Sequence, residues 1–276
     1  MHGQGFAPVS TIFPDFATTV AGWTGTRVFY DDFETNVAEG SFLATYGTAG
    51  TRPSKWDLYP SNFFVTNQNP ANGGNGNHYG GDTNVSVANG KCQQRLYYDA
   101  ASGKSIGSCL EPILPGNTKY MTYGRIAVEI VVPQTAINWK PAWLWWPQTD
   151  DFGTKLWPAA GEFDWMEGQL TSTFGAFHHW YNAATGGDQD SWSSSTRFDT
   201  GTHIVVAEWT PNYVRTIVDG VQMGIRDAST LNGGTSRIVP NPMRLALQSE
   251  PEIGFTPTGT SLLQINQVAI HNYTGL

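Results

Sequence analysis

The chain has 276 residues, of which only 14% are charged, and it contains 31 glycines and 16 prolines. This composition excludes a protein built mainly from solvent-exposed helices, which need Lys, Glu and Arg, and predicts an all-β fold with many turns. The formal net charge of −8 at pH 7 argues against nucleic acid and anionic membranes as partners, because both attract positively charged proteins, and favours a neutral partner.

The elements are predicted to be short strands in one domain. Residues 1–25, which include Pro8 and Pro14, are expected to form an extended N-terminal arm, and residues 26–276 a single domain. A Gly- and Asn-rich segment at 67–81 predicts a long loop, of the kind that is usually functional. No helix-period segment exceeds a turn or two, which favours a sandwich or barrel. Strands are predicted at 26–30, 84–88, 124–132, 141–146, 162–167, 174–180, 203–209, 213–218, 243–248 and 262–271, and residues 213–223 are predicted to form a hairpin about an Asp-Gly turn.

Two cysteines and the chain start bear on the compartment. Cys92 and Cys109 are too few for a disulfide framework and leave one bridge or two free thiols open. The first residues lack the charged and apolar regions of a signal peptide, so we expect a secreted protein whose signal peptide is absent from this sequence. No apolar stretch approaches the roughly 20 residues that span a bilayer. We expect a monomer.

The segment Gly161-Glu-Phe-Asp-Trp-Met-Glu-Gly168 places three acids within six residues. On a regular strand Glu162 and Asp164 share one face, while Glu167 points to the other. A β-bulge near Trp165 and Met166 would absorb one residue and return Glu167 to the same face.

Three acids on one face repel one another, and glycoside hydrolysis explains their presence. The reaction needs one carboxylate that attacks the anomeric carbon and another, of raised pKa, that protonates the leaving oxygen. We predict that Glu162 is the nucleophile, Glu167 the general acid/base and Asp164 the group that orients the nucleophile. The alternatives are a calcium site and a solvated edge strand, and the apolar residues between the acids count against the edge strand.

The acid segment resembles the E-x-D-x-x-E signature of glycoside hydrolase family 16, with the additional Met of its laminarinase-like branch. Further similar segments extend over residues 28–275: Tyr123-Gly-Arg125, Trp139-Lys-Pro-Ala-Trp143-Leu-Trp-Trp146-Pro, Leu156-Trp-Pro158, Gly175-Ala-Phe-His178, and Ala207-Glu-Trp-Thr-Pro211 through Val218-Asp-Gly220. The resemblance implies a β-jelly-roll sandwich of two curved antiparallel sheets with a concave substrate cleft. It also implies hydrolysis with retention of configuration and no redox or organic cofactor.

The resemblance also implies roles for single residues. It supports the roles of the three acids and puts His178 beside the acid/base, although the adjacent His179 leaves the register open. The 11 tryptophans fit both a large core and sugar-stacking platforms. Trp145, Trp165 and Trp209 are predicted to be core residues. The predicted substrate-binding residues are Trp139, Trp143, Trp157, Trp180, Gln248 and Arg125, the last equally well explained as a rim charge.

Some residues depart from the family pattern. Ala127 and Glu129 replace an acid and a base of the relatives, which puts substrate contacts at that strand in doubt. Asn266 stands where relatives often carry an Asp associated with a structural calcium ion, although acids at 31, 32 and 34 remain as oxygen ligands. We therefore assign no metal to the active site and no required cofactor, and leave a structural calcium ion open.

The sequence thus predicts a retaining endo-β-glycanase that cleaves a neutral polysaccharide, either β-1,3-glucan or mixed β-1,3/1,4-glucan. Agar, porphyran or another galactan is the alternative substrate, and the loop at 67–81 is expected to influence the choice. The alternative of another class is a non-catalytic carbohydrate-binding sandwich, which would keep the Trp platforms but needs no pair of glutamates.

Overall fold

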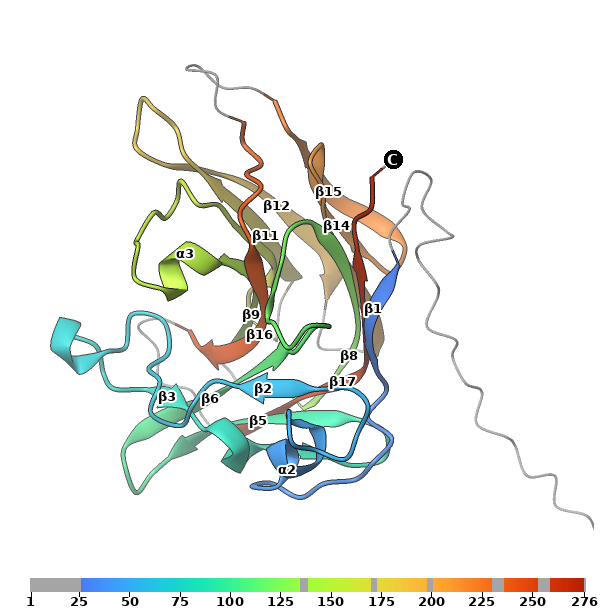
Figure 1. The fold of residues 1–276 in the computed structure, drawn as a ribbon. Helices are drawn as coiled ribbons and strands as arrows, with labels where there is room; N and C mark the ends of the chain where they lie inside the picture. Colours follow the sequence, from blue (N-terminus) through green and yellow to red (C-terminus); the bar gives the residue numbers. More distant parts are fainter. Residues whose placement is uncertain are drawn as a thin grey trace, which may run out of the picture.

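Two curved β-sheets lie face to face in the computed structural model, which describes residues 26–134, 139–169, 173–197, 201–229, 236–252 and 259–275 (Figure 1). The predicted N-terminal arm lies outside these residues. Within them no helix is long and apolar enough to cross a membrane. The 17 strands are β1 (Arg27–Asp31), β2 (Trp56–Leu58), β3 (His78–Tyr79), β4 (Val85–Val87), β5 (Cys92–Asp99), β6 (Lys104–Pro112), β7 (Tyr120–Met121), β8 (Gly124–Gln134), β9 (Trp139–Pro147), β10 (Glu162–Glu167), β11 (Thr173–Trp180), β12 (Asp188–Arg197), β13 (Thr202–Trp209), β14 (Tyr213–Val218), β15 (Val221–Asp227), β16 (Met243–Pro251) and β17 (Thr260–Asn272).

One sheet carries the acid segment and the other packs behind it. The first runs β12-β11-β10-β9-β16-β6-β2, with β7 also paired to β16. The second runs β15-β14-β13-β8-β17, and β17 pairs with β5 through its first half and with β1 through its second. Strand β6 pairs with both β5 and β16 and so links the sheets. These pairings are antiparallel, as the jelly-roll prediction requires.

The segments between strands are short helical turns and loops. Helix α2 (Phe42–Tyr46) packs near β2, and α3 (Gln148–Asp151) follows β9 directly. The predicted loop at 67–81 contains the 3₁₀ turn η1 (Pro70–Asn72) and the two residues of β3, and η2 (Gly81–Asn84) follows. The predicted hairpin of β14 and β15 is confirmed, with its turn at Asp219 and Gly220, both at positive φ. The prediction missed β5, β6 and β12 and the short strands β2, β3 and β7. The polar sequences of β5 and β12 explain two of these omissions.

Tryptophans fill the space between the sheets. Trp139, Trp143 and Trp145 of β9 and Trp165 of β10 are each 0% exposed, and Trp209 joins the same cluster. The prediction that Trp145, Trp165 and Trp209 are core residues is confirmed. The prediction that Trp139 and Trp143 stack on sugar is wrong, because the strand period of two puts them on the same core-facing side as Trp145.

Arg125 is not a substrate-binding residue either. It lies on β8 in the second sheet, where its neighbours Ile126 and Val128 face the core and Arg125 faces away from it. Its side chain is 0% exposed, and its Nε lies 3.3 Å from a carboxylate oxygen of Glu208 on β13. Because Arg125 lies on the outer side of the second sheet, the core separates it from the acids on β10 in the first sheet.

Two further questions left by the sequence concern cysteine and calcium. Both thiols, Cys92 and Cys109, are free and buried, so no bridge joins them.

The acids at 31, 32 and 34 surround Arg52, whose guanidinium lies 3.5, 3.4 and 3.7 Å from their carboxylate oxygens. These oxygens therefore already have a cationic partner.

Replacement of Trp143 by Ala tests its place in the core. It is expected to lower the free energy of unfolding by about 3–5 kcal/mol, because it removes a fully buried ring and leaves a cavity. The control is Trp157→Ala, which removes the same side chain at a position 48% exposed and is expected to cost no more than about 1.5 kcal/mol. Urea unfolding of both variants gives the comparison, and equal losses would contradict the assignment.

Candidate active site

A β-bulge in β10 brings the three acids to one face. Glu162 pairs with His179 and Asp164 with Phe177, but Glu167 pairs with Gly175, so three steps along β10 match two along β11. The β9 side shows the same irregularity between Asp164 and Met166. The bulge that the sequence predicted at residues 165 and 166 is thus confirmed. Both of its residues are buried in the core.

Burial makes the carboxyl groups of Glu162 and Asp164 hard to ionise. Glu162 is 9% exposed, and burial, followed by the charge of Asp164, raises its pKa well above the usual value. Burial likewise raises the pKa of Asp164, and the charge of Glu167 adds to the effect. The indole N–H of Trp157 donates a hydrogen bond of 2.5 Å to Oε2 of Glu162 and favours its charged form.

The histidine beside the acids is His179, so the prediction of His178 is wrong by one residue. Along β11 the side chains alternate, and His178 points to the core with 4% exposure. Burial lowers the pKa of His178 to about 3, so it is neutral. His179 lies on the side of the acids, and its Nε2 is 3.2 Å from Oδ2 of Asp164.

Three other predicted substrate-binding residues have different positions. Trp157 is half exposed, and its ring centroid lies 5.5 Å from that of His179. Gln248 lines the same cavity as Glu162. Trp180 is 5% exposed, and the guanidinium of Arg237 lies 4.8 Å from its ring centroid. Burial leaves no open ring face for a sugar, so the prediction for Trp180 is wrong.

A cleft with aromatic walls adjoins Glu162. The cavity has a volume of about 740 Å³, and its lining includes Trp146 of β9, Gln248 of β16, and Phe63 and Phe64 from the segment before β3. The exposed fractions of Phe63 and Phe64 are 49% and 37%, so both rings are available to a ligand. Sequence reasoning missed these three aromatic residues. Strand alternation identifies Trp146 once Trp145 is placed in the core.

A second hollow of about 570 Å³ continues the cleft and shares Phe63, Asp151 and Arg244 with it. Its two cations, Arg244 and Lys119, are already paired. Arg244 binds Asp151 at 2.6 Å and Glu111 at 2.8 Å, and Lys119 binds Glu111 at 2.7 Å. This part of the cleft therefore offers paired charges rather than a cationic patch, which suits an uncharged ligand.

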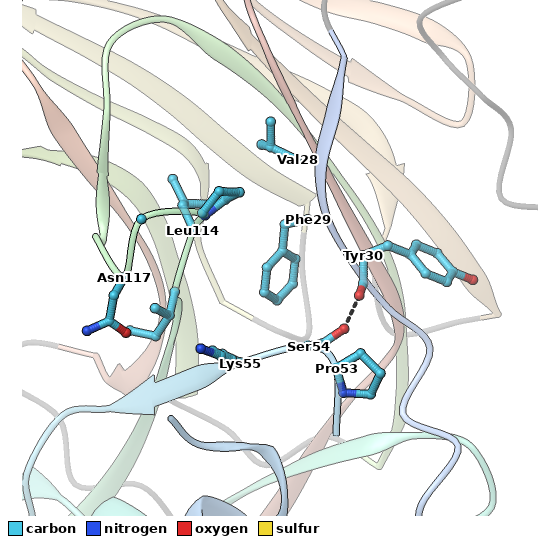
Figure 2. Close-up of a pocket in the computed structure, with 11 residues that line it drawn as sticks. Val28, Phe29, Tyr30, Pro53, Ser54, Lys55, Leu114 and Asn117 are labelled. Atoms are coloured by element: carbon cyan, nitrogen blue, oxygen red, sulfur yellow. Dashed lines mark hydrogen bonds between the residues drawn. The ribbon is translucent and has the colours of Figure 1, made fainter. Parts of the chain in front are cut away.

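Another hollow, of about 310 Å³, lies between β1 and residues 113–117 (Figure 2). Its lining includes Phe29, Leu114 and Lys55, and the hydroxyl of Ser54 donates to the carbonyl of Tyr30. None of its lining residues is a carboxylate or a histidine. It therefore lacks the acid–base groups that distinguish the cleft beside β10.

Glu162, Asp164 and His179 also bring possible ligand atoms within 4.8 Å of one another. Two of these groups already have partners within the site: the indole N–H of Trp157 donates a hydrogen bond to Glu162, and Nε2 of His179 lies 3.2 Å from Oδ2 of Asp164.

Comparison with known proteins gives partial matches in sequence. No protein-family model matches the chain. A β-glucanase of Rhodothermus marinus is 29% identical over 106 residues, 36% of this chain and 35% of that protein. A β-1,3-glucan-binding protein of Penaeus monodon is 27% identical over 99 residues, 34% of this chain and 26% of that protein. The alignments thus span about a third or less of the length of these relatives.

Solved structures are similar over most of the chain. An endo-1,3-β-glucanase of Streptomyces sioyaensis superposes with a TM-score of 0.65 at 20% identity, covering 91% of this chain and 97% of that one. A non-specific endo-β-1,3(4)-glucanase from family GH16 superposes with a TM-score of 0.63 at 17% identity, covering 92% and 97%. The protein is therefore an all-β sandwich with the fold of the glycoside hydrolase family 16 glucanases, as the sequence resemblance implied.

The raised pKa of Glu162 predicts a stability effect that does not depend on activity. Because the folded state holds the proton more tightly than the unfolded chain, the free energy of unfolding falls as pH rises from the usual carboxyl pKa through the raised one. Glu162→Gln removes the buried charge and is expected to stabilise the protein by about 0.5–2 kcal/mol at pH 8, with little effect at pH 4. The control is Glu34→Gln, whose carboxylate is 71% exposed. Thermal unfolding at both pH values measures the difference, and a destabilised Glu162→Gln at pH 8 would contradict the prediction.

Proposed function

We propose that this protein is a retaining endo-acting glycoside hydrolase that cleaves a neutral β-linked polysaccharide, either β-1,3-glucan or mixed β-1,3/1,4-glucan. The observation that carries the proposal is the bulged strand β10, which aligns three carboxylates beside a cleft with aromatic walls. We also propose that it is secreted and monomeric and requires no cofactor.

In the first step, the ionised form of Glu162, which the hydrogen bond from Trp157 favours against the effect of burial, attacks the anomeric carbon while Glu167 donates its proton to the leaving glycosidic oxygen. The bond to the leaving sugar breaks and a glycosyl ester of Glu162 forms. The indole N–H of Trp157 is bonded to Oε2 of Glu162, which leaves Oε1 for the attack. Asp164, which His179 contacts, stands between the two glutamates in the sequence of the strand, and we assign it the role of orienting the nucleophile.

In the second step, Glu167 removes a proton from water, and the resulting nucleophile cleaves the ester with net retention. Exposure supports this division of roles. The side chain of Glu167 is 27% exposed, whereas Glu162 is only 9% exposed. The group that exchanges protons with water is thus the more open one.

The nature of the substrate is supported by the cleft and by the relatives. Aromatic side chains on the cleft wall suit the apolar faces of sugar rings, and the paired cations suit an uncharged chain. Two adjoining hollows provide length for several sugar units, as endo-cleavage requires. The similar proteins include a β-glucanase, an endo-1,3-β-glucanase and a non-specific endo-β-1,3(4)-glucanase.

A non-catalytic carbohydrate-binding protein is the second candidate, favoured by the similarity to a β-1,3-glucan-binding protein. Binding alone gives no reason to bury two carboxyl groups, Glu162 and Asp164, beside a third acid. Incubation with laminarin separates the two candidates, since a binding protein would bind laminarin without shortening it.

Product size and stereochemistry test the main proposal. The protein is incubated with laminarin, lichenan, agarose and porphyran, and we expect shortened oligosaccharides from the first two, with β-configured reducing ends in early proton NMR spectra. Glu162→Gln and Glu167→Gln are each expected to lower kcat by at least about 10³-fold, since each removes a group that acts in the transition state. Cleavage of the galactans alone would transfer the proposal to those substrates, and full activity of Glu162→Gln would refute it.

Replacement of the two neighbouring histidines tests their assignment. His179→Ala is expected to lower kcat by up to about 10²-fold with little change in KM, because Asp164 loses the contact that orients it. His178→Leu serves as the matched control, since its neutral side chain faces the core. It is expected to change the unfolding temperature more than kcat. The opposite pattern, with His178→Leu inactive but stable, would support the sequence prediction that His178 is the histidine beside the acids.

A further inference from the structure

A lysine lies between the proposed acid/base and a buried glutamate. The ammonium Nζ of Lys140 donates a hydrogen bond of 2.6 Å to Oε1 of Glu167 and lies 3.9 Å from Oε1 of Glu250. Lys140 and Glu250 are direct cross-strand partners on β9 and β16. Their side chains are 8% and 2% exposed, so water screens little of the attraction.

Glu250 is held in place by β3 and by the segment that leads to it. The hydroxyl of Tyr79 donates a hydrogen bond of 2.9 Å to its Oε2, and the backbone N–H of Thr66 donates another of 3.2 Å. Burial raises the pKa of Glu250, while the ammonium of Lys140 and these donors act in the opposite direction. The pKa of Glu250 is raised overall, because burial outweighs these partners. Its carboxyl group is nevertheless fixed 3.9 Å from the ammonium that also binds Glu167, so the two acids compete for Lys140.

Lys140 stays charged in this position. Burial lowers its pKa, but the carboxylates of Glu167 and then Glu250 outweigh that effect and raise it overall. Glu252, just beyond β16, adds in the same direction. The acid/base thus faces a permanent positive charge at hydrogen-bond distance.

We propose that Lys140 is a positioning residue that holds the Glu167 carboxyl toward the scissile bond and favours its ionised form, and that Glu250 sets the strength of this effect by competing for the same ammonium. The inference rests on the proposed function. When Glu167 passes its proton to the glycosidic oxygen, the carboxylate that remains accepts a hydrogen bond already aimed at it. Proton donation is thereby favoured, at the cost of a smaller protonated fraction at high pH.

The other ionisable groups around Glu167 are acids. They are Asp164 and Glu162 on its own strand, and the charge of Glu167 raises the pKa of both. The facing residue on β11 is Gly175, which carries no charge, and His179 contacts Asp164 rather than Glu167. Among the residues that the structure describes, Lys140 is thus the cation in contact with Glu167, and its removal has an effect of predictable sign.

The pH dependence of kcat/KM on laminarin tests the proposal. Lys140→Met is expected to move the alkaline limb, where the acid/base loses its proton, upward by about one pH unit. Glu250→Gln is expected to move the same limb downward, because Lys140 then acts on Glu167 alone. Lys140→Arg keeps the charge and is expected to stay near wild type. Lys91→Met, which removes a cation from the turn between β4 and β5, is the control.

A merely structural role predicts lower activity or a lower unfolding temperature at every pH, without opposite displacements. The proposal would be overturned if the alkaline limb moved in the same direction in Lys140→Met and Glu250→Gln, or if it moved in neither variant. The carboxyl ¹³C signal of Glu167, titrated by NMR in the wild type and in Glu250→Gln, gives a readout that needs no activity. It must move downward in Glu250→Gln even if no glycan is cleaved, so failure of this inference and failure of the proposed function are distinguished. This measurement also decides the matter if Lys140→Met does not fold.

Discussion

The site depends on one extra residue in β10. Without the bulge, Glu167 would point into the core, and the two glutamates would not share one face of the sheet. The bulge is stabilised from the side opposite the site, where Trp165 and Met166 are both buried and the Trp165 ring lies 5.3 Å from that of Trp143. The tryptophan core therefore also stabilises the bulge. It keeps the consecutive side chains of Trp165 and Met166 on the core side, so that Glu167 points to the same face as Glu162 and Asp164.

Much of this arrangement could be read from the sequence, but strand alternation left one choice open. It correctly gave the bulge and the shared face of Glu162 and Asp164. It did not say which face of β9 is the core, and the wrong choice carried Trp139 and Trp143 to the cleft together. The same one-residue ambiguity separated His178 from His179. Each error put a side chain on the wrong face of its strand, because successive residues of a strand point to opposite faces.

Residues that lie close only through strand pairing were beyond the reach of local patterns. Lys140 and Glu250 are far apart in the sequence and become partners only because β9 pairs with β16 in a particular register. Arg125 shows the converse case. Its motif resembles the family pattern, but β8 lies in the second sheet, so its charge meets Glu208 and not a sugar. Motif and spacing identify the chemistry, whereas register decides which residues take part.

The cleft wall and the proton chemistry are linked by the segment before β3. This segment carries Phe63 and Phe64 into the cleft, and its backbone N–H at Thr66 binds Glu250 together with the hydroxyl of Tyr79 in β3. Under the proposed function, a sugar that packs against these aromatic rings would contact the same segment that binds Glu250. Lys140 lies between Glu250 and Glu167, 3.9 Å from the first and 2.6 Å from the second. The wall of the cleft and the proposed acid/base are therefore connected through a short series of direct contacts.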